Sequence, residues 1–405
     1  MLFYLFLSSL LNYLDRVALS VVAPQIRSQL GLTHLDYAWV LSSFLIMYAL
    51  FCTLGGRLAD FLGSKRTIFL SIALWSAASI LHAGVASLAY LIIVRGLLGI
   101  GEACFYPAAL KLVGERFSPM HRAKAASFLV LGMGVGITVT PPLVSWIAGW
   151  AGWRAMFAVT GSAGVLLLLG WKFGDKTVLP LSEPAKESVP AESIPTDFFP
   201  ALKKTNNPLS PLLKSRTLWI LLIARSLGDA VWFFYIFWLP QYLVQDRGFT
   251  LFELGFLGWI PFFMADLGAW SGGWISSRLI MRGWPVLKSR KTVLLGSAAL
   301  LPMGIVAALT GSHWSALALT GVALWGIMSY GTVVMTLPAD LFPAQRIGLV
   351  VGLCGTAGSL AGAGFQGATG WLLDHHGYFP VFLIAGLLHP MAALLLTIFL
   401  KPSRE

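Results

Sequence analysis

The chain has 405 residues, of which 57% are hydrophobic and 11% are charged, and it carries a formal net charge of +11. Soluble domains contain about 25% charged residues, so this composition excludes an ordinary soluble protein. The basic residues lie in short segments between apolar runs and not on one amphipathic face, which argues against a nucleic-acid partner. The composition therefore predicts an all-α polytopic membrane protein surrounded by a lipid bilayer.

The first apolar run carries the polar sequence NYLDR near its middle, from Asn12 to Arg16. A charged side chain at the centre of a membrane helix costs about 2.5–3.5 kcal/mol even on lenient insertion scales. Asp15 and Arg16 are therefore expected to face a polar interior and not lipid. Six such runs are predicted before the first long polar segment: 2–25, 36–57, 67–86, 88–113, 124–147 and 153–172.

A segment rich in Pro, Ser, Glu and Lys follows, and it has the composition of a linker. Six further apolar runs come after it. We therefore predict twelve transmembrane helices in two six-helix bundles, residues 1–172 and 218–400, with a linker at 173–217 and a tail at 401–405. The later runs are 218–243, 252–276, 291–310, 314–336, 346–372 and 379–400.

The basic residues also predict how the helices are oriented. They are concentrated in alternate loops, the linker and the tail, whereas the opposite side holds only Arg27, Arg154 and Arg247. Positively charged loops stay in the cytoplasm, so both termini and the linker are expected there. The halves repeat as well, because SKRTIFL at 64–70 matches SRKTVLL at 289–295. Such a repeat is typical of a transporter whose site lies between pseudo-symmetric halves near the bilayer midplane.

The charges of the first half suggest a transport mechanism. Arg95 and Glu102 are seven residues apart and share one face of a helix, and Asn12 lies four residues before Arg16. Arginine stays charged, whereas a carboxylate removed from water can take up a proton. Protonation of Asp15 or Glu102 would therefore free an arginine to bind a substrate carboxylate. The alternative is that these acids and arginines only hold helices together as buried ion pairs, with Arg95 as a supporting charge.

Aromatic and amide side chains of the second half suit a polyhydroxylated substrate, which can stack on rings and hydrogen-bond to amides. Tyr235, Trp238 and Gln366 are the candidate contacts, although ordinary helix packing explains each of them equally well. Asp229 and Asp266 are predicted to be supporting charges. Asp229 could instead form a salt bridge one turn along its own helix.

The segment GGRLADFLGSKR, between the second and third runs, is the most specific motif of the chain. It resembles the major facilitator superfamily signature G-x-L-x-D-x-x-G-x-K-R. The resemblance implies two closely packed helices and a latch that holds one conformation. The second-half copy, GGWISSRLIMRGWPVLKSRK, has Ser277 where an Asp is usual, so the second latch should be weaker or built differently. The latch residues of the first copy are Gly56, Asp60, Gly63, Lys65 and Arg66.

Other segments resemble one branch of that superfamily. NYLDR and RGLLGIGEACFYPAALKLVGERF look like the anion:cation symporter family, and VWFFYIFWLPQYL resembles its hexuronate and sugar-acid members, which include galactonate-like symporters. The resemblance implies that the chain imports an organic monoanion together with protons across a bacterial inner membrane. It also implies that Asp15 and Glu102 are the proton-linked acids. Arg16 and Tyr48 would contact the anion, with Asn12 on the same polar stripe.

Other functions are less well supported. GITVTPPL does not match the helix-5 pattern Gly-Pro-x-x-Gly-Gly of exporters, while another small carboxylate, an inorganic anion, or sodium in place of protons stays an open alternative. An intramembrane enzyme would need a nucleophile beside a base, and Ser8 has no nearby His. The chain is expected to be a monomer without cofactor or metal, and its cysteines to be small buried hydrophobic residues.

Overall fold

The computed structural model describes residues 1–117, 119–174 and 212–400, and within these ranges the regular elements are all helices. The predicted tail at 401–405 and most of the predicted linker at 173–217 lie outside the described residues. The helices are α1 (Leu2–Leu30), α2 (His34–Leu62), α3 (Ser64–His82), α4 (Leu88–Arg116), α5 (Pro119–Gly174), α7 (Arg216–Gln245), α8 (Leu251–Leu257), α9 (Ile260–Met281), α10 (Val286–Ala298), α11 (Met303–Leu309), α12 (His313–Leu341), α13 (Ala344–His376) and α14 (Tyr378–Phe399).

Local sequence explains where several helices begin and end. The Thr33 hydroxyl accepts a hydrogen bond from the Asp36 N–H, and the Asp36 carboxylate accepts one from the Thr33 N–H, which together form a capping box for α2. Gly31 adopts the left-handed conformation that ends α1. These signals confine the turn between α1 and α2 to three residues, so the two helices run in opposite directions.

Two predicted helices are interrupted in the structure. The run 252–276 divides into α8 and α9, and Pro261 stands at the start of α9, where a missing N–H costs nothing. The run 291–310 divides into α10 and α11 around Pro302. Conversely, two predicted runs lie inside α5, which is broken only at Gly152, with φ 80° and ψ 162°.

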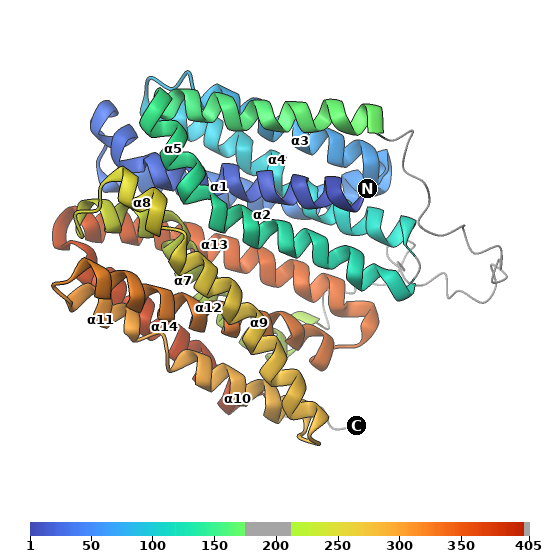
Figure 1. Cartoon of the computed structure of the whole chain (residues 1–405). Coiled ribbons are helices and arrows are strands. Elements are labelled where there is room, and N and C mark those ends of the chain that lie inside the picture. The colour runs from blue at the N-terminus through green and yellow to red at the C-terminus, as the bar shows by residue number, and fades with distance from the viewer. Residues whose placement is uncertain (118, 175–211, 401–405) are drawn as a thin grey trace.

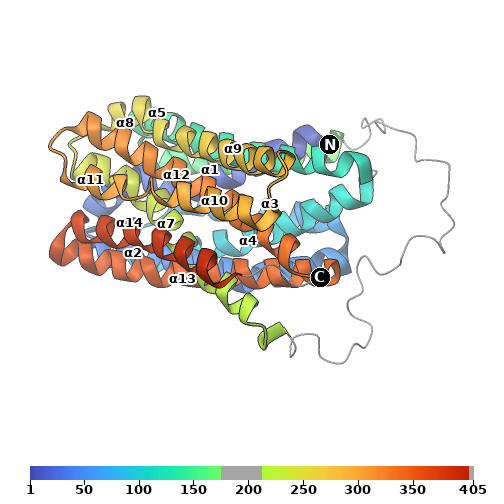
Figure 2. The same cartoon turned by 90° about the horizontal axis from the view of Figure 1, so that it is seen from below.

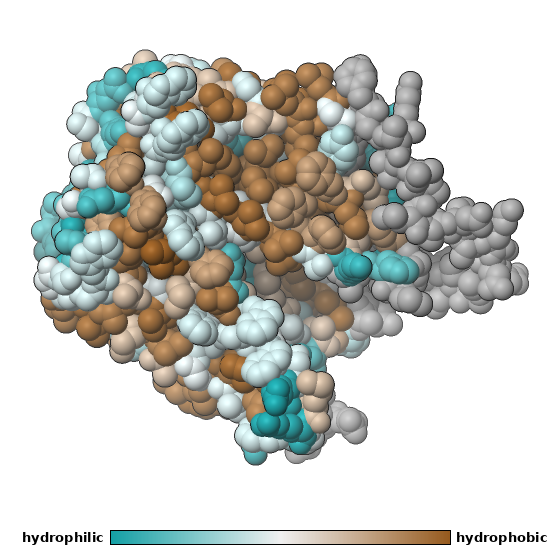
Figure 3. Space-filling view, in the orientation of Figure 1, coloured by the Kyte–Doolittle hydropathy of each residue, from teal (hydrophilic) through white to brown (hydrophobic). Residues whose placement is uncertain are grey.

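Ten segments of the described ranges are long and apolar enough to cross a membrane. The longest, Lys124–Gly170, has 47 residues and contains the break at Gly152. α3 has 19 residues and is not among the ten. The structure is thus an all-helical protein with many membrane-spanning candidates, and hydrophobic side chains cover much of its outer face (Figure 3).

The helices of the first half pack mainly on one another, and so do those of the second half. α1 packs on α5, α2 on α4, and α3 on both α4 and α5, while α7 packs on α13 and α14, and α9 on α12. The main contacts between these sets run along α2 and α13, α5 and α8, and α1 and α7 (Figures 1 and 2).

The two ends of the helical assembly differ. The start of α1 and the end of α14 lie at one end, called here the terminal end (Figure 2). The other end, which holds the turn at residues 31–33, is called the distal end. Toward the terminal end α5 and α9 diverge, and the surface between them is hollowed (Figures 1 and 3).

Candidate functional site

A buried ion pair joins α1 to α4. The Nε of Arg16 donates a hydrogen bond to Oε2 of Glu102 over 2.8 Å, and both side chains are almost completely buried. Among the residues that the structure describes, the second carboxylate oxygen of Glu102 has no hydrogen-bond partner. Asn12 accepts a longer bond of 3.4 Å from Nη2 of the same arginine. A buried ion pair that leaves polar atoms without hydrogen bonds contributes little to the stability of helix packing. This arrangement therefore favours a functional role for the pair.

Aromatic rings surround the guanidinium of Arg16. Its central carbon lies 4.4 Å from the ring centre of Tyr13, 4.8 Å from that of Tyr48 and 5.2 Å from that of Phe44. A cation–π contact is worth about 2 kcal/mol or more away from water. The rings therefore offer the cation favourable surroundings that do not depend on the charge of Glu102.

Arg95 does not pair with an acid in the structure. Its Nη1 and Nη2 donate to the backbone carbonyl oxygens of Asp15 and Arg16, over 3.4 Å and 2.5 Å. Its guanidinium also lies 4.9 Å from the ring centre of Phe44. The possible Asp15–Arg95 ion pair is therefore replaced by bonds to the backbone of α1, and Arg95 fixes the segment that carries Asp15 and Arg16.

Asp15 points away from the Arg16–Glu102 pair. Its Oδ1 accepts a hydrogen bond of 2.9 Å from the hydroxyl of Ser79 on α3. Successive residues of a helix are about 100° apart around its axis, so Asp15 and its neighbour Arg16 must face different helices. The structure consequently separates the two predicted proton-linked acids into two environments.

Close backbone contacts hold α4 in place. A Cβ added at Gly99 would lie 2.5 Å from the carbonyl oxygen of Phe44 on α2. A Cβ added at Gly101 would lie 2.7 Å from the backbone nitrogen of Trp75 on α3. Real Cβ atoms do not approach backbone atoms so closely. At these two glycines the helix that carries Glu102 therefore packs directly against the backbones of α2 and α3.

The contacts described above form the Arg16 cluster, which consists of Arg16, Glu102, Asn12 and the rings of Tyr13, Phe44 and Tyr48. A second set of polar side chains lies on its distal side, and one pair of this set links the two halves. Trp238 donates a 2.5 Å bond to Oε1 of Gln366, whose amide nitrogen has no partner in the described part of the chain. Arg27 on α1 donates a 3.1 Å bond to Gln241 on α7. The sequence places Arg27 only on the side with few basic residues, because its partner on α7 is recognisable only in the fold.

Asp374 joins the halves at the distal end by capping a helix of the other half. Its carboxylate oxygens accept 2.9 Å bonds from the backbone N–H groups of His34 and Leu35, the first residues of α2. The His34 ring lies 2.7 Å from the same carboxylate. A carboxylate at a helix N-terminus also interacts favourably with the helix dipole.

Replacing Asp374 with alanine is expected to loosen the start of α2. Two charge-assisted bonds are lost, each worth about 1.5–3 kcal/mol, so amide hydrogen exchange at residues 34–37 should become at least about tenfold faster. Asp246→Ala is the matched control, because this distal carboxylate pairs with Arg247 within the second half. Equal protection of α2 in both variants would contradict the cross-half cap.

The remaining predicted contacts of the second half lie elsewhere. Asp266 on α9 accepts a 3.1 Å bond from Thr138 on α5, so it does lie between the halves. Asp229 forms a 2.7 Å salt bridge with Arg225 one turn away. Tyr235 is buried against Phe382, and its hydroxyl points at Gly304 on α11. The structure thus brings Asp266 to the interface but directs Tyr235 into the packing of the second half.

The predicted latch pairs Asp60 with a residue that the motif does not contain. Oδ1 of Asp60 lies 2.6 Å from Nζ of Lys111 on α4, which also donates to the carbonyl of Ala59. Gly63 joins α2 and α3 at a φ of 85°, which favours glycine. The glycines were expected to bring α2 close to α3, but the tight contact is between α2 and α4, where a Cβ added at Gly55, and not at Gly56, would meet the backbone of Cys104.

The second latch is built differently, as the sequence predicts. Arg290 on α10 pairs with Asp340 on α12 over 3.0 Å, and its Nη1 donates a 2.9 Å bond to the Ser276 hydroxyl on α9. Arg290 corresponds to Lys65 in the repeated segment. The second half therefore joins three helices through this arginine, beside the position where Ser277 replaces the usual Asp.

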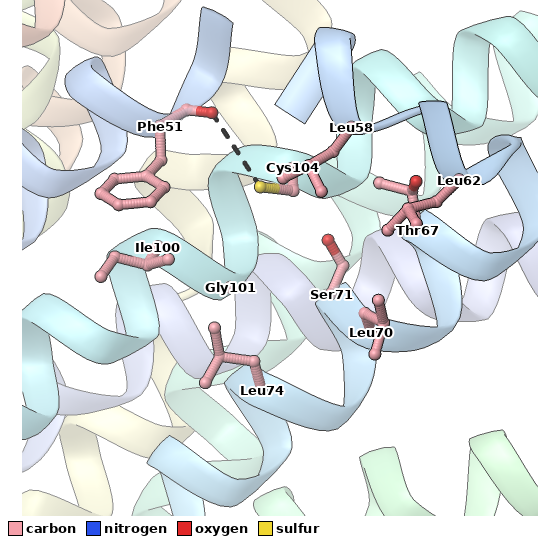
Figure 4. A pocket seen from close by; sticks show the side chains of 10 residues that line it. All are labelled: Phe51, Leu58, Leu62, Thr67, Leu70, Ser71, Leu74, Ile100, Gly101 and Cys104. Carbon is pink, nitrogen blue, oxygen red and sulfur yellow. Dashed lines mark hydrogen bonds between the residues drawn. The ribbon is translucent and has the colours of Figure 1, made fainter. Parts of the chain in front are cut away.

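A separate pocket of about 140 Å³ lies between α2, α3 and α4 (Figure 4). Apolar side chains such as Leu58, Leu70 and Leu74 form most of its wall, and Cys104 points from it toward the carbonyl of Phe51. No charged side chain lines it. The pocket does not suit an anion, so the Arg16 cluster is the candidate substrate site. Within the described ranges no group of three or more metal-binding side chains occurs.

Comparison with known proteins decides the family. A family model described as Major Facilitator Superfamily matches residues 5–366. The chain belongs to the Major Facilitator Superfamily. Its members are membrane transporters, so the expectation of a transporter and not an enzyme is confirmed. With bacterial relatives and many apolar helices, this superfamily member is a multi-pass protein of a bacterial inner membrane.

Curated relatives match the superfamily member over nearly its whole length. A hexuronate transporter of Bacillus subtilis is 30% identical, covering 98% of this chain and 94% of its own. A D-galactonate transporter of Escherichia coli is 27% identical, covering 93% and 89%. The crystal structure of a D-xylose–proton symporter shares the fold with a TM-score of 0.75 at 16% identity, covering 100% of this chain and 98% of that one.

Proposed function

We propose that the protein imports an organic monoanion of the hexuronate or aldonate type by proton symport with alternating access. One observation carries the proposal: the buried Arg16–Glu102 pair, in which, among the described residues, the cation is held by one acid whose other oxygen has no hydrogen-bond partner. The names of the curated relatives support a sugar acid as substrate.

The pair couples proton binding to substrate binding, because the carboxylates of Glu102 and of the substrate compete for Arg16. While Glu102 is charged, it occupies the guanidinium. A proton on Glu102 removes that charge, and a substrate carboxylate can then form a two-pronged bond with Arg16. Asn12 and Tyr48, which already contact this arginine, are proposed to contact the substrate beside it. The hydroxyls of the sugar acid would meet Trp238 and Gln366 across the interface.

The proposed topology has twelve crossings with cytoplasmic termini. The segment Lys124–Gly170 has 47 residues, which is about 70 Å of helix at 1.5 Å per residue and far exceeds a hydrocarbon core of about 30 Å. We propose that it crosses twice and that α3 crosses as well, which raises ten segments to twelve. The domains are proposed to be 1–172 and 218–400, joined by the cytoplasmic linker 173–217.

The contacts between the halves suggest which side is closed. Arg27–Gln241 and the Asp374 cap join the halves at the distal end, which the positive-inside rule assigns to the periplasm. The hollow between α5 and α9 opens toward the terminal end (Figure 3). We therefore propose an inward-open arrangement. The Asp60–Lys111 and Arg290–Asp340 pairs each join helices of the same half.

Uptake by purified protein in liposomes tests the function. With an acidic exterior, labelled D-galactonate or D-glucuronate is expected to accumulate inside, and a protonophore should abolish the accumulation. Protein-free liposomes and an imposed sodium gradient are the controls. Accumulation that ignores pH and protonophores but follows sodium would overturn proton coupling, while failure to transport either acid would overturn the substrate class.

A further inference from the structure

Two hydroxyl groups enclose the side chain of Asp15. Ser79 on α3 donates a 2.9 Å bond to its Oδ1, and the Ser79 oxygen lies 3.3 Å from Oγ1 of Thr160 on α5. All three residues are at most 3% exposed. The other carboxylate oxygen of Asp15 is buried without a partner. This hydroxyl pair is thus the immediate polar surrounding of an acid that has no salt bridge among the described residues.

The hydroxyl pair can serve both protonation states of Asp15, because a hydroxyl both donates and accepts. When Asp15 is charged, Ser79 donates to it, and Thr160 can donate to Ser79 or to the Phe157 carbonyl 3.4 Å away. When Asp15 takes a proton from solvent, its new O–H can donate to Ser79, whose hydroxyl then turns toward Thr160. Only one proton is gained, no other covalent bond is made or broken, and the hydrogen bonds between the three side chains reverse direction.

The other titratable and charged groups near Asp15 form their hydrogen bonds with partners other than its carboxylate. Arg95 on α4 bonds to the backbone oxygen of Asp15, and Glu102 on α4 is paired with Arg16. His82 on α3 bonds to the carbonyl of Ala78 and stacks on Phe157. On α5 the group that faces the acid is the hydroxyl of Thr160. The carboxylate therefore depends on Ser79 for its charge-assisted hydrogen bond.

We propose that Ser79 and Thr160 are positioning residues that hold Asp15 and set the pH at which it exchanges its proton during transport. The inference rests on the proton coupling proposed above. It adds two residues that lie outside the Arg16 cluster and that touch Asp15 only from α3 and the second part of α5. Neither residue is expected to contact the substrate.

The pH profile of D-galactonate uptake by the full-length protein tests this inference. Ser79→Ala removes a donor to the charged carboxylate, so the proton should persist to higher pH and the alkaline midpoint of uptake should rise by about one pH unit. Thr160→Val should shift it in the same direction, and Ser79→Thr should restore it. Ser20→Ala is the control, because this buried hydroxyl bonds only to the Val17 carbonyl of its own helix.

Infrared titration of the carboxyl C=O band supplies a readout without substrate. The band lost in Asp15→Asn identifies the residue, and its midpoint should rise in Ser79→Ala but not in Ser20→Ala. An unchanged midpoint in a folded Ser79→Ala protein would overturn the inference while leaving the proposed function intact. Conversely, gradient-driven uptake that survives Asp15→Asn would overturn the coupling role of Asp15, and the infrared shift would still decide whether the hydroxyls hold it.

Discussion

Replacing Arg16 with alanine should abolish substrate binding. Among the described residues its guanidinium meets the acid Glu102, the amide of Asn12 and the rings of Tyr13 and Tyr48. Truncating one partner of a buried, hydrogen-bonded charge pair in a complex costs about 2–5 kcal/mol, so affinity for D-galactonate should fall by at least about thirtyfold. Binding is measured as the ligand-induced rise in melting temperature of the purified protein.

Two further variants separate binding from folding. Arg16→Ala leaves Glu102 buried without its cation, so the double variant Arg16→Ala/Glu102→Gln should recover stability but not binding. Arg16→Lys keeps a charge but loses the planar two-pronged geometry, and it should bind more weakly than the natural protein. Retained affinity in the double variant would remove Arg16 from the substrate site.

Replacing Glu102 with glutamine should separate exchange from accumulation. Glutamine imitates the protonated acid permanently, so Arg16 stays available to the substrate carboxylate at every pH. Gradient-driven accumulation of D-galactonate should therefore disappear, whereas counterflow exchange should persist at a similar rate. Both are measured in the same liposomes, by adding labelled substrate outside with or without unlabelled substrate inside.

A matched Glu→Gln change controls for general damage. Glu253 is an exposed acid that caps α8 at Thr250, so Glu253→Gln should leave both accumulation and exchange intact. Equal loss of accumulation and exchange in Glu102→Gln would indicate that Glu102 supports binding or folding instead. Persistent accumulation would show that another acid carries the proton.

The sequence predicts the helices well because apolar length is a strong local signal. It misses the interruptions near Pro261 and Pro302, since hydropathy alone does not register a helix break inside an apolar run. The alternative of buried ion pairs would also give Arg95 an acidic partner, whereas it bonds to backbone carbonyls. Whether Arg95 meets an acid or a backbone carbonyl depends on how α4 is rotated against α1, and spacing within one helix cannot give that rotation.

Contacts between distant segments explain the other differences. Lys111 becomes the partner of Asp60 only because α4 lies beside the end of α2. Tyr235 and Trp238 are three residues apart, yet one is buried against α11 and the other meets Gln366 on α13. For the same reason Ser79 and Thr160 carry no recognisable motif, since small hydroxyl residues are common in membrane helices.

The glycine contacts of α4 have a mechanical consequence. The backbone of α4 is in direct contact with the backbones of both neighbouring helices. It therefore cannot rotate or shift along its axis by itself without a steric clash. Under the proposed alternating access, we therefore expect Glu102 to keep its place relative to α2 and α3. Transport would then proceed by tilting whole sets of helices against each other, with the movement taken up at the contacts of α2 with α13 and of α5 with α8.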